Sequence, residues 1–198
     1  MTDAEPSAAR SEPAPRAARR RVLAITLLVA CVVVIWTIDQ AVKQWVVATL
    51  PLGESVPVVG EALQFHFVRN SGAAFSIASG ATWIFSILAT AVAIAIVWFA
   101  PRIRSVAWAV FFGLLLGGNL GNLTDRLFRE PGFGVGHVID FVYTPWLMPA
   151  IYNVADIAIV SSVVLFVLLT ILGVRIDGTR APRRGPAGRP AASPGEGA

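Results

Sequence analysis

Four long apolar runs separated by polar segments dominate this chain. They cover about residues 22–47, 81–100, 105–123 and 150–174. Each is close to the roughly 20 residues that a helix needs to cross a bilayer. The run 81–100 contains no ionisable side chain, while the other three carry polar residues toward one end. This pattern predicts a mainly α membrane protein, built as a bundle of four transmembrane helices.

The segments between the runs carry weaker signals. Residues 63–67 (Leu-Gln-Phe-His-Phe) alternate with the period of two that is typical of a half-buried strand. Residues 135–142, which include Asp140, form a second possible short strand. We therefore expect a small extracytoplasmic β-sheet, or cradle, on the membrane surface and a loop over about 127–149 that faces the same side.

The composition agrees with this class. The chain is 56% hydrophobic, only 14% charged and has a mean hydropathy of +0.69, whereas a soluble domain is about 25% charged. Both ends are instead rich in Ala, Pro and Arg, so we expect residues 1–20 and 176–198 to be disordered basic tails around a membrane domain at 21–175. The single cysteine, Cys31, excludes an internal disulfide and a cysteine-based zinc site.

The arginines predict the orientation. They cluster before the first run, between the second and third (101–104) and after the fourth. Positive residues mark the cytoplasmic side of a membrane protein, so both termini are expected to be cytoplasmic. The segments 48–80 and 124–149 then lie outside, and all the polar motifs gather at the outer face.

Asp39 and Lys43 lie near the outer end of the first span. They are four residues apart on one helix face, with the acid before the base as such pairs prefer. Ionisable residues this deep in a membrane pair with each other or with polar groups of other helices. The pair is either a structural ion pair or part of a functional site.

Cys31 presents a second possible interpretation of the first span. Arginines, an apolar run and then Leu28-Val29-Ala30-Cys31 resemble the site at which bacterial lipoproteins are lipidated and cleaved. In such a precursor the apolar region has about 7–15 residues and ends at the cleavage site. Here it continues through Val32 to Trp36, which favours a helix residue over a modified cysteine.

The third and fourth spans end and begin in polar residues. Gly113, Gly117 and Gly121 recur every four residues and predict close helix packing. The polar residues that follow at helical spacing are Asn119, Asn122, Asp125 and Arg126 in the third span, and Asn153 and Asp156 in the fourth. Packing alone does not require these carboxamides and carboxylates, and at membrane depth they indicate a functional site.

The polar motifs, taken in order, resemble those of lipoprotein signal peptidase (signal peptidase II), a bacterial membrane aspartic protease. The resemblance covers about 22–174. The matching motifs are Asp39 with Lys43, Asn70-Ser71-Gly72-Ala73-Ala74-Phe75, Gly118-Asn119-Leu120-Gly121-Asn122-Leu123-Thr124-Asp125-Arg126, Val138-Ile139-Asp140-Phe141 and Asn153-Val154-Ala155-Asp156. Five matches in the expected topological places make the resemblance specific.

The resemblance implies a function and a site. Asp140 and Asp156 match the catalytic pair, in which one ionised carboxylate activates water and the other, protonated, donates to the scissile carbonyl. Asn122 and Asn153 would hold the carboxylates or the peptide. The other implied supporting residues are Asn70 toward the substrate backbone, Arg126 and Asp125 fixing the loop, and Asp39 and Lys43 bracing the first span. Asn70 could equally be an ordinary turn residue.

The implied substrate is a diacylglyceryl-modified prolipoprotein, cut just before its lipidated cysteine in the bacterial inner membrane. No cofactor, metal or nucleic acid is implied, and we expect a monomer among membrane lipids. Three rivals are a transporter or proton channel, a Ser–Lys protease using Lys43 with Ser71 or Ser76, and a metalloprotease using His66 and His137. The channel fits poorly because the polar residues do not continue to the cytoplasmic side, and no His-Glu-x-x-His helix is present.

Overall fold

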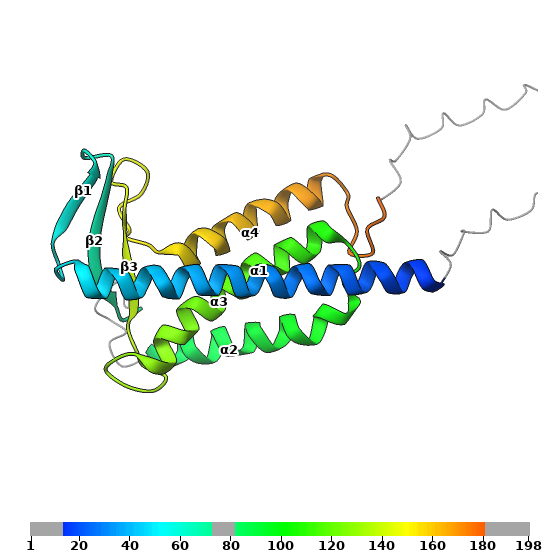
Figure 1. The fold of residues 1–198 in the computed structure, drawn as a ribbon, viewed down its shortest axis with the longest axis horizontal. Helices are drawn as coiled ribbons and strands as arrows, with labels where there is room; N and C mark the ends of the chain where they lie inside the picture. Colours follow the sequence, from blue (N-terminus) through cyan, green and yellow to red (C-terminus); the bar gives the residue numbers. More distant parts are fainter. Residues whose placement is uncertain (1–13, 73–81, 181–198) are drawn as a thin grey trace, which may run out of the picture.

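The computed structural model describes residues 14–72 and 82–180 (Figure 1). Its elements, in order, are α1 Ala14–Thr49, β1 Ser55–Val59, β2 Leu63–Asn70, α2 Thr82–Phe99, the 3₁₀ helix η1 Ala100–Arg102, α3 Val106–Phe128, β3 Val138–Tyr143 and α4 Val154–Ile171. Four helices within the described residues are long and apolar enough to cross a membrane. The predicted fold class is therefore confirmed. Part of one motif, residues 73–75, and also Ser76 lie outside the described residues.

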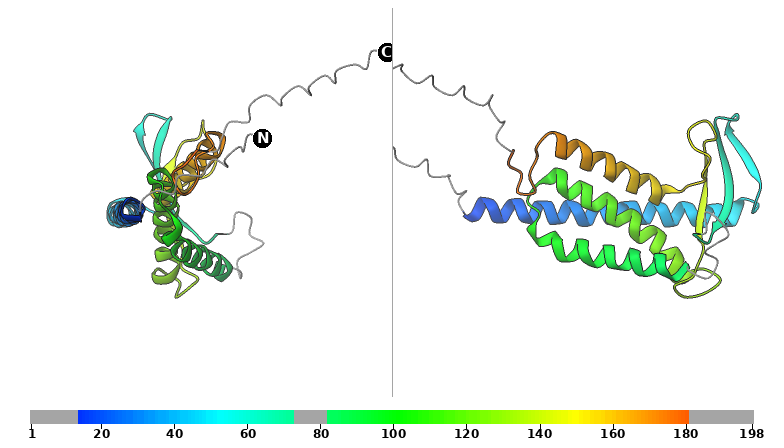
Figure 2. Two further views of the ribbon diagram at one scale, coloured as in Figure 1. Left: turned by 90° about the vertical axis from the view of Figure 1, so that its right-hand side faces the viewer. Right: turned by 180° about the vertical axis from the view of Figure 1, so that it is seen from behind.

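Helix α3 is the centre of the bundle. It packs against α1, α2 and α4, which are arranged around it in the end-on view (Figure 2). It is also the most buried of the four spans, and its mean hydropathy is the lowest. The most polar span is thus enclosed by the others, because polar groups are costly to expose to lipid.

The glycines predicted to allow close packing form the seam between α1 and α3. A Cβ on Gly113 would meet the side chain of Cys31, and one on Gly117 would meet Ile35. A Cβ on Gly121 would lie 2.5 Å from the Asp39 carboxylate. The small residues therefore let α1 lie directly on α3, and Cys31 is a packing residue on that seam.

The helix boundaries differ from the predicted spans where local chemistry decides them. Helix α1 begins at Ala14, inside the segment 1–20 that was expected to be disordered, because Ala and Arg are strong helix formers and carry the helix beyond the membrane. Helix α4 begins at Val154 rather than at 150, because Asn153 caps it and Tyr152 instead pairs with Val142 as an extended residue. Helix α3 continues to Phe128, past the expected end at 123.

The sheet lies across one end of the bundle. Its order is β1-β2-β3 with antiparallel neighbours, and both described chain ends lie at the opposite end of the bundle (Figure 1). One face of the sheet packs an apolar cluster of Val46, Phe67, Ile139 and Phe141 against the end of α1. Successive residues of a strand point to opposite faces, so Asp140 lies on the other face, toward Asn153 at the start of α4.

Candidate functional site

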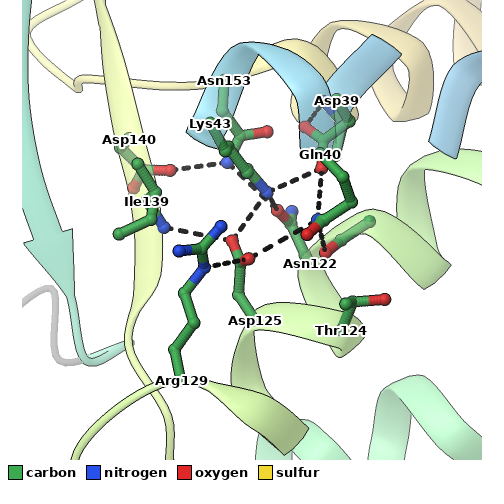
Figure 3. A network of polar contacts seen from close by, with 12 residues as sticks. Asp39, Gln40, Lys43, Asn122, Thr124, Asp125, Arg129, Ile139, Asp140 and Asn153 are labelled. Carbon is green, nitrogen blue, oxygen red and sulfur yellow. Dashed lines mark hydrogen bonds and ion pairs between the residues drawn. The ribbon is translucent and has the colours of Figure 1, made fainter. Parts of the chain in front are cut away.

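Polar residues from α1, α3, β3 and α4 meet beside the sheet, at the sheet end of the bundle (Figure 3). Lys43, from α1, is the centre of this cluster and is fully buried. Its ammonium group lies 2.9 Å from Asp39 Oδ2, 2.8 Å from Asp125 Oδ2 and 3.0 Å from Asn122 Oδ1. An ammonium has three N–H donors, so each of the three has an acceptor.

The two carboxylates that hold Lys43 extend the cluster to the other elements. Asp39 Oδ1 accepts the backbone N–H of Ala155 in the first turn of α4 at 3.0 Å. Asp125 Oδ2 accepts the backbone N–H of Ile139, the residue before Asp140 in β3, at 3.2 Å. The cluster therefore fixes α4 and β3, the two elements that carry the candidate catalytic residues, to α1 and α3.

Asp140 and Asp156 are joined by two carboxamides. Asn153 Nδ2 donates to Asp140 Oδ1 at 2.6 Å and to Asn122 Oδ1 at 3.0 Å. Asn122 Nδ2 donates to Asp156 Oδ1 at 2.8 Å. Asn122 Oδ1 also accepts from Lys43, so Asn122 links Lys43 to Asp156 through hydrogen bonds.

Asp156 is positioned by the start of its own helix. Asn153 and Asp156 form a capping box, in which Asn153 Oδ1 accepts the Asp156 N–H at 3.0 Å and Asp156 Oδ2 accepts the Asn153 N–H at 3.1 Å. Both contacts satisfy N–H groups that the first turn of a helix leaves without partners. The helix dipole also favours a carboxylate at this end. Local sequence thus fixes the side chain of Asp156.

Asp140 is buried and held from both sides. Its Oδ2 accepts from Asn70 Nδ2 of β2 at 2.7 Å, and its Oδ1 accepts from Asn153. Burial raises the pKa of Asp140 to about 6; the amide of Asn70 opposes this, and the nearby charge of Asp156 adds to it. A carboxyl group that exchanges its proton near neutral pH suits general acid–base chemistry.

Asp125 and Arg126, the residues expected to fix the loop, contact different parts of the structure. The two oxygens of Asp125 receive Lys43, Arg129 and the Ile139 N–H. Arg126 lies over the ring of Phe85 on α2, with its guanidinium carbon 5.1 Å from the ring centroid. It therefore braces α2 and the start of the segment that follows Asn70, where a Cβ on Gly72 would come 3.1 Å from Arg126 Nη2.

Sequence reasoning missed two members of the cluster. Arg129 donates through Nε to Asp125 Oδ1 at 2.5 Å, and Gln40 Nε2 donates to Asp39 Oδ2 and to the Gly121 carbonyl, both at 3.1 Å. Arg129 lies four residues after Asp125. The same spacing rule that pairs Asp39 with Lys43 identifies this pair.

A mainly apolar cavity of about 390 Å³ opens beside Asp156. Leu147, Met148 and Tyr152 line one side, and Ile157 and Val160 of α4 line the other. Ile157 and Val160 are also among the exposed apolar residues of α4. One candidate catalytic carboxylate therefore borders a surface that suits hydrocarbon.

Comparison with known proteins identifies the family that has this fold and these motifs. A family model described as signal peptidase (SPase) II matches residues 31–172. A lipoprotein signal peptidase of Leifsonia xyli is 55% identical over 183 residues, which cover 92% of this chain and 84% of the relative. That of Mycobacterium tuberculosis (strain ATCC 25618 / H37Rv) is 40% identical over 177 residues, covering 89% and 85%. The chain belongs to the signal peptidase II family.

Members of the signal peptidase II family are proteases that remove signal peptides from prolipoproteins, and the resemblance drawn from the motifs is confirmed. A solved structure described as a bacterial membrane enzyme has the same fold. Its TM-score is 0.66 at 29% identity, and the match covers 73% of this chain and 92% of that one. This signal peptidase is thus a membrane protein with bacterial relatives.

The rival sites find no support within residues 14–72 and 82–180. No cluster of three or more His, Cys, Asp or Glu there could hold a metal ion. His66 instead lies 2.6 Å from the Ser55 hydroxyl, on the sheet. The acceptors of Lys43 among the described residues are two carboxylates and an amide, and Ser71 is not one of them; Ser76 lies outside these residues.

Proposed function

We propose that this signal peptidase II is an aspartic endopeptidase that cuts diacylglyceryl-modified prolipoproteins just before the lipidated cysteine, with Asp140 and Asp156 as its catalytic pair. The observation that carries this proposal is the bridge between them: two carboxylates from separate elements are linked through Asn153 and Asn122. The raised pKa of Asp140, to about 6, gives the pair a proton to share near neutral pH.

The proposed reaction is hydrolysis by an activated water molecule. One ionised carboxylate takes a proton from water as the water oxygen attacks the scissile carbonyl carbon. The other carboxyl group donates its proton to the carbonyl oxygen, which stabilises the charge that develops there. The carbon–nitrogen bond then breaks, and the proton taken from water passes to the amine of the cysteine that leaves. As the carbonyl reforms, the proton on its oxygen returns to the carboxylate that donated it, so both groups regain their starting state. The pair titrates as a unit, so the proton belongs to both groups.

The supporting residues would act through position. Asn153 and Asn122 hold one oxygen of each carboxylate, and Asn70 holds the second oxygen of Asp140. The oxygens are thus directed before substrate arrives, which is how a preorganised site lowers a barrier. Asp39, Lys43 and Asp125 fix the helices and the strand behind them. We propose these as positioning residues, outside the chemistry itself.

The cavity beside Asp156 is the proposed place of the lipid-bearing cysteine. Its lining is mainly apolar, and it continues into exposed apolar residues of α4 such as Ile157 and Val160. A diacylglyceryl chain placed there would extend into the bilayer while the cysteine backbone stays near the carboxylates.

We further propose an inner-membrane location with both termini cytoplasmic and the site toward the outer face. The basic clusters and the positive-inside rule support this orientation. The structure is compatible with it, because both described chain ends lie opposite the sheet (Figure 1). A monomer suffices for the proposed chemistry, since one chain supplies both carboxylates.

A cleavage assay tests the proposal. The purified protein is incubated with one prolipoprotein in diacylglyceryl-modified and unmodified forms. We expect cleavage of the modified form only, and almost none by Asp156→Asn. Asp177→Asn, the same change at an exposed site beyond the end of α4, is the matched control and should cleave normally. Normal turnover by Asp156→Asn would remove Asp156 from the chemistry, and equal cleavage of both substrates would refute the lipid requirement.

A further inference from the structure

A second cavity, polar where the one beside Asp156 is apolar, lies away from the carboxylate pair. It has a volume of about 260 Å³ and is lined by the polar side chains of Arg69, Arg129, Glu130 and His137 over the apolar Val47 and Ile139. None of these polar groups belongs to the proposed catalytic pair. Three of the four donate N–H groups, so the cavity presents mainly hydrogen-bond donors.

Strand register places this cavity on the face of the sheet opposite Asp140. Arg69 of β2 is paired with Ile139 of β3, and Val68 is paired with Asp140. Paired residues share a face, and their neighbours along the strand point to the other face. Arg69 and Ile139 therefore lie together on the side away from Asp140, and a ligand in this cavity is separated from the proposed active site by the sheet.

Arg129 contributes its guanidinium group to the cavity lining. Its Nε is bonded to Asp125, and its Nη2 is buried without a hydrogen-bond partner among the described residues. A ligand in the cavity therefore meets the rest of the guanidinium group. Guanidinium groups bind oxyanions such as phosphate through charge-assisted hydrogen bonds. An oxyanion bound here would accept from the part of Arg129 that lines the cavity.

Glu130 is the one carboxylate that lines the cavity, and it is weakly held. Its ion pair with Arg69 measures 3.1 Å, but the Glu130 side chain is 84% exposed. Exposed ion pairs contribute little to stability, about 0–1 kcal/mol. An incoming anion can therefore displace Glu130 and take Arg69 as its partner. Asp125, behind Arg129, is also paired with Lys43 and so is shared between two cations.

The position of the cavity indicates what brings the anion. Val47 lies near the end of α1, and Phe128, which also lines the cavity, ends α3. These are the sheet ends of two membrane spans, the depth at which lipid head groups lie. Phe128 is 76% exposed, so apolar surface continues from the cavity into the bilayer. Basic pockets between membrane helices bind phospholipid head groups.

We propose that this cavity binds the phosphate group of an anionic phospholipid, with Arg69, Arg129 and His137 as donors. The phosphate oxygens would accept from the guanidinium groups of Arg69 and Arg129, and the acyl chains would run beside Phe128. This site is independent of the catalytic proposal, because none of its donors takes part in that chemistry.

Lipid titration of the purified protein in neutral detergent micelles tests the site. The readout is the thermal unfolding midpoint, which rises with any ligand that binds only the folded state. Phosphatidylglycerol should raise the midpoint in a saturable way, and phosphatidylcholine, whose choline offsets the phosphate charge, should raise it less. Inorganic phosphate forms the second arm. An equal rise with inorganic phosphate would overturn the lipid assignment, and no saturable rise with phosphatidylglycerol would overturn the site.

Variants of opposite sign sharpen the test. Arg69→Gln should weaken phosphatidylglycerol binding by about tenfold, the value of one charge-assisted hydrogen bond. Glu130→Gln should strengthen binding, because it removes the competing carboxylate. Glu61→Gln makes the same charge change at an exposed turn between β1 and β2 and should leave affinity unchanged. Wild-type affinity in Arg69→Gln, or an equal gain in Glu61→Gln and Glu130→Gln, would overturn the proposal.

Discussion

Replacement of Lys43 tests whether the buried cluster holds the bundle together. Lys43 and Arg129 balance Asp39 and Asp125, so the four charges sum to zero. Lys43→Met leaves Asp39 without a cationic partner, whereas Asp125 keeps Arg129. Removing one partner of a buried ion pair costs about 3–5 kcal/mol. We expect a loss of that size in the free energy of unfolding.

The double variant Asp39→Asn/Lys43→Met separates charge from shape. It restores neutrality, and the introduced carboxamide keeps an oxygen that can accept the Ala155 N–H now bonded to Asp39. The double variant should therefore be more stable than Lys43→Met alone, with a coupling energy of about 2 kcal/mol or more. Simple addition of the two single effects would refute this account of the cluster.

Cys31 provides the assay for both variants. It is the single cysteine of the chain and packs on α3 at Gly113, so a thiol-reactive dye labels it faster when α1 leaves the bundle. Labelling across a denaturant series gives the free energy of unfolding, provided that unfolding is reversible in the chosen micelles. Val42→Ala, a change on α1 outside the charged cluster, provides a control for effects on α1 in general.

Three further predictions concern the site and its packing. Asp140→Asn and Asp156→Asn should each nearly abolish cleavage in the lipidated-substrate assay, and the double variant should be scarcely worse, since groups that act as a unit lose activity non-additively; additive losses would contradict a pair. Because the folded pKa of Asp140 is raised to about 6, the folded state binds its proton more tightly than the unfolded chain. Wild type should therefore lose up to about 3 kcal/mol of stability relative to Asp140→Asn as the pH rises from about 4 to 6, and parallel pH curves for the two proteins would refute this. Gly121→Ala should cost about 1–3 kcal/mol, because the new Cβ would lie 2.5 Å from Asp39, whereas Gly132→Ala, with nothing within 4 Å, should have little effect in the dye assay; similar midpoints for the two would contradict the packing argument.

Much of the fold could be predicted because membrane spans and motif positions are local signals. Apolar length identified the four helices, and a three-residue spacing put Asn153 and Asp156 in one turn. The capping box between these two residues follows from the same spacing, although it was not predicted. The resemblance to a family then selected Asp140, which no local rule distinguishes from other loop carboxylates.

What escaped prediction depends on contacts between distant elements. The contact of Asp125 with Lys43 was not predicted: the two side chains lie 2.8 Å apart, and no spacing rule predicts a contact across 82 residues of sequence. The start of α4 was set four residues early, since Tyr152 is apolar enough to continue a span. Its pairing with Val142 in an extended conformation becomes visible only when β3 is in place.

The Lys43 cluster also has a consequence for biosynthesis. Spans enter the membrane in chain order, so α1 is present before α3 and α4 exist. At that stage the carboxylate partner of Lys43 within its own helix is Asp39, and the i,i+4 pair leaves no net charge at the sheet end of α1. Asp125 arrives with the third span, and the Ala155 N–H, which donates to Asp39 in the finished bundle, arrives with the fourth. The same event that completes the bundle sets Asp140 and Asp156 in place, so a half-made chain in the membrane lacks the proposed catalytic pair.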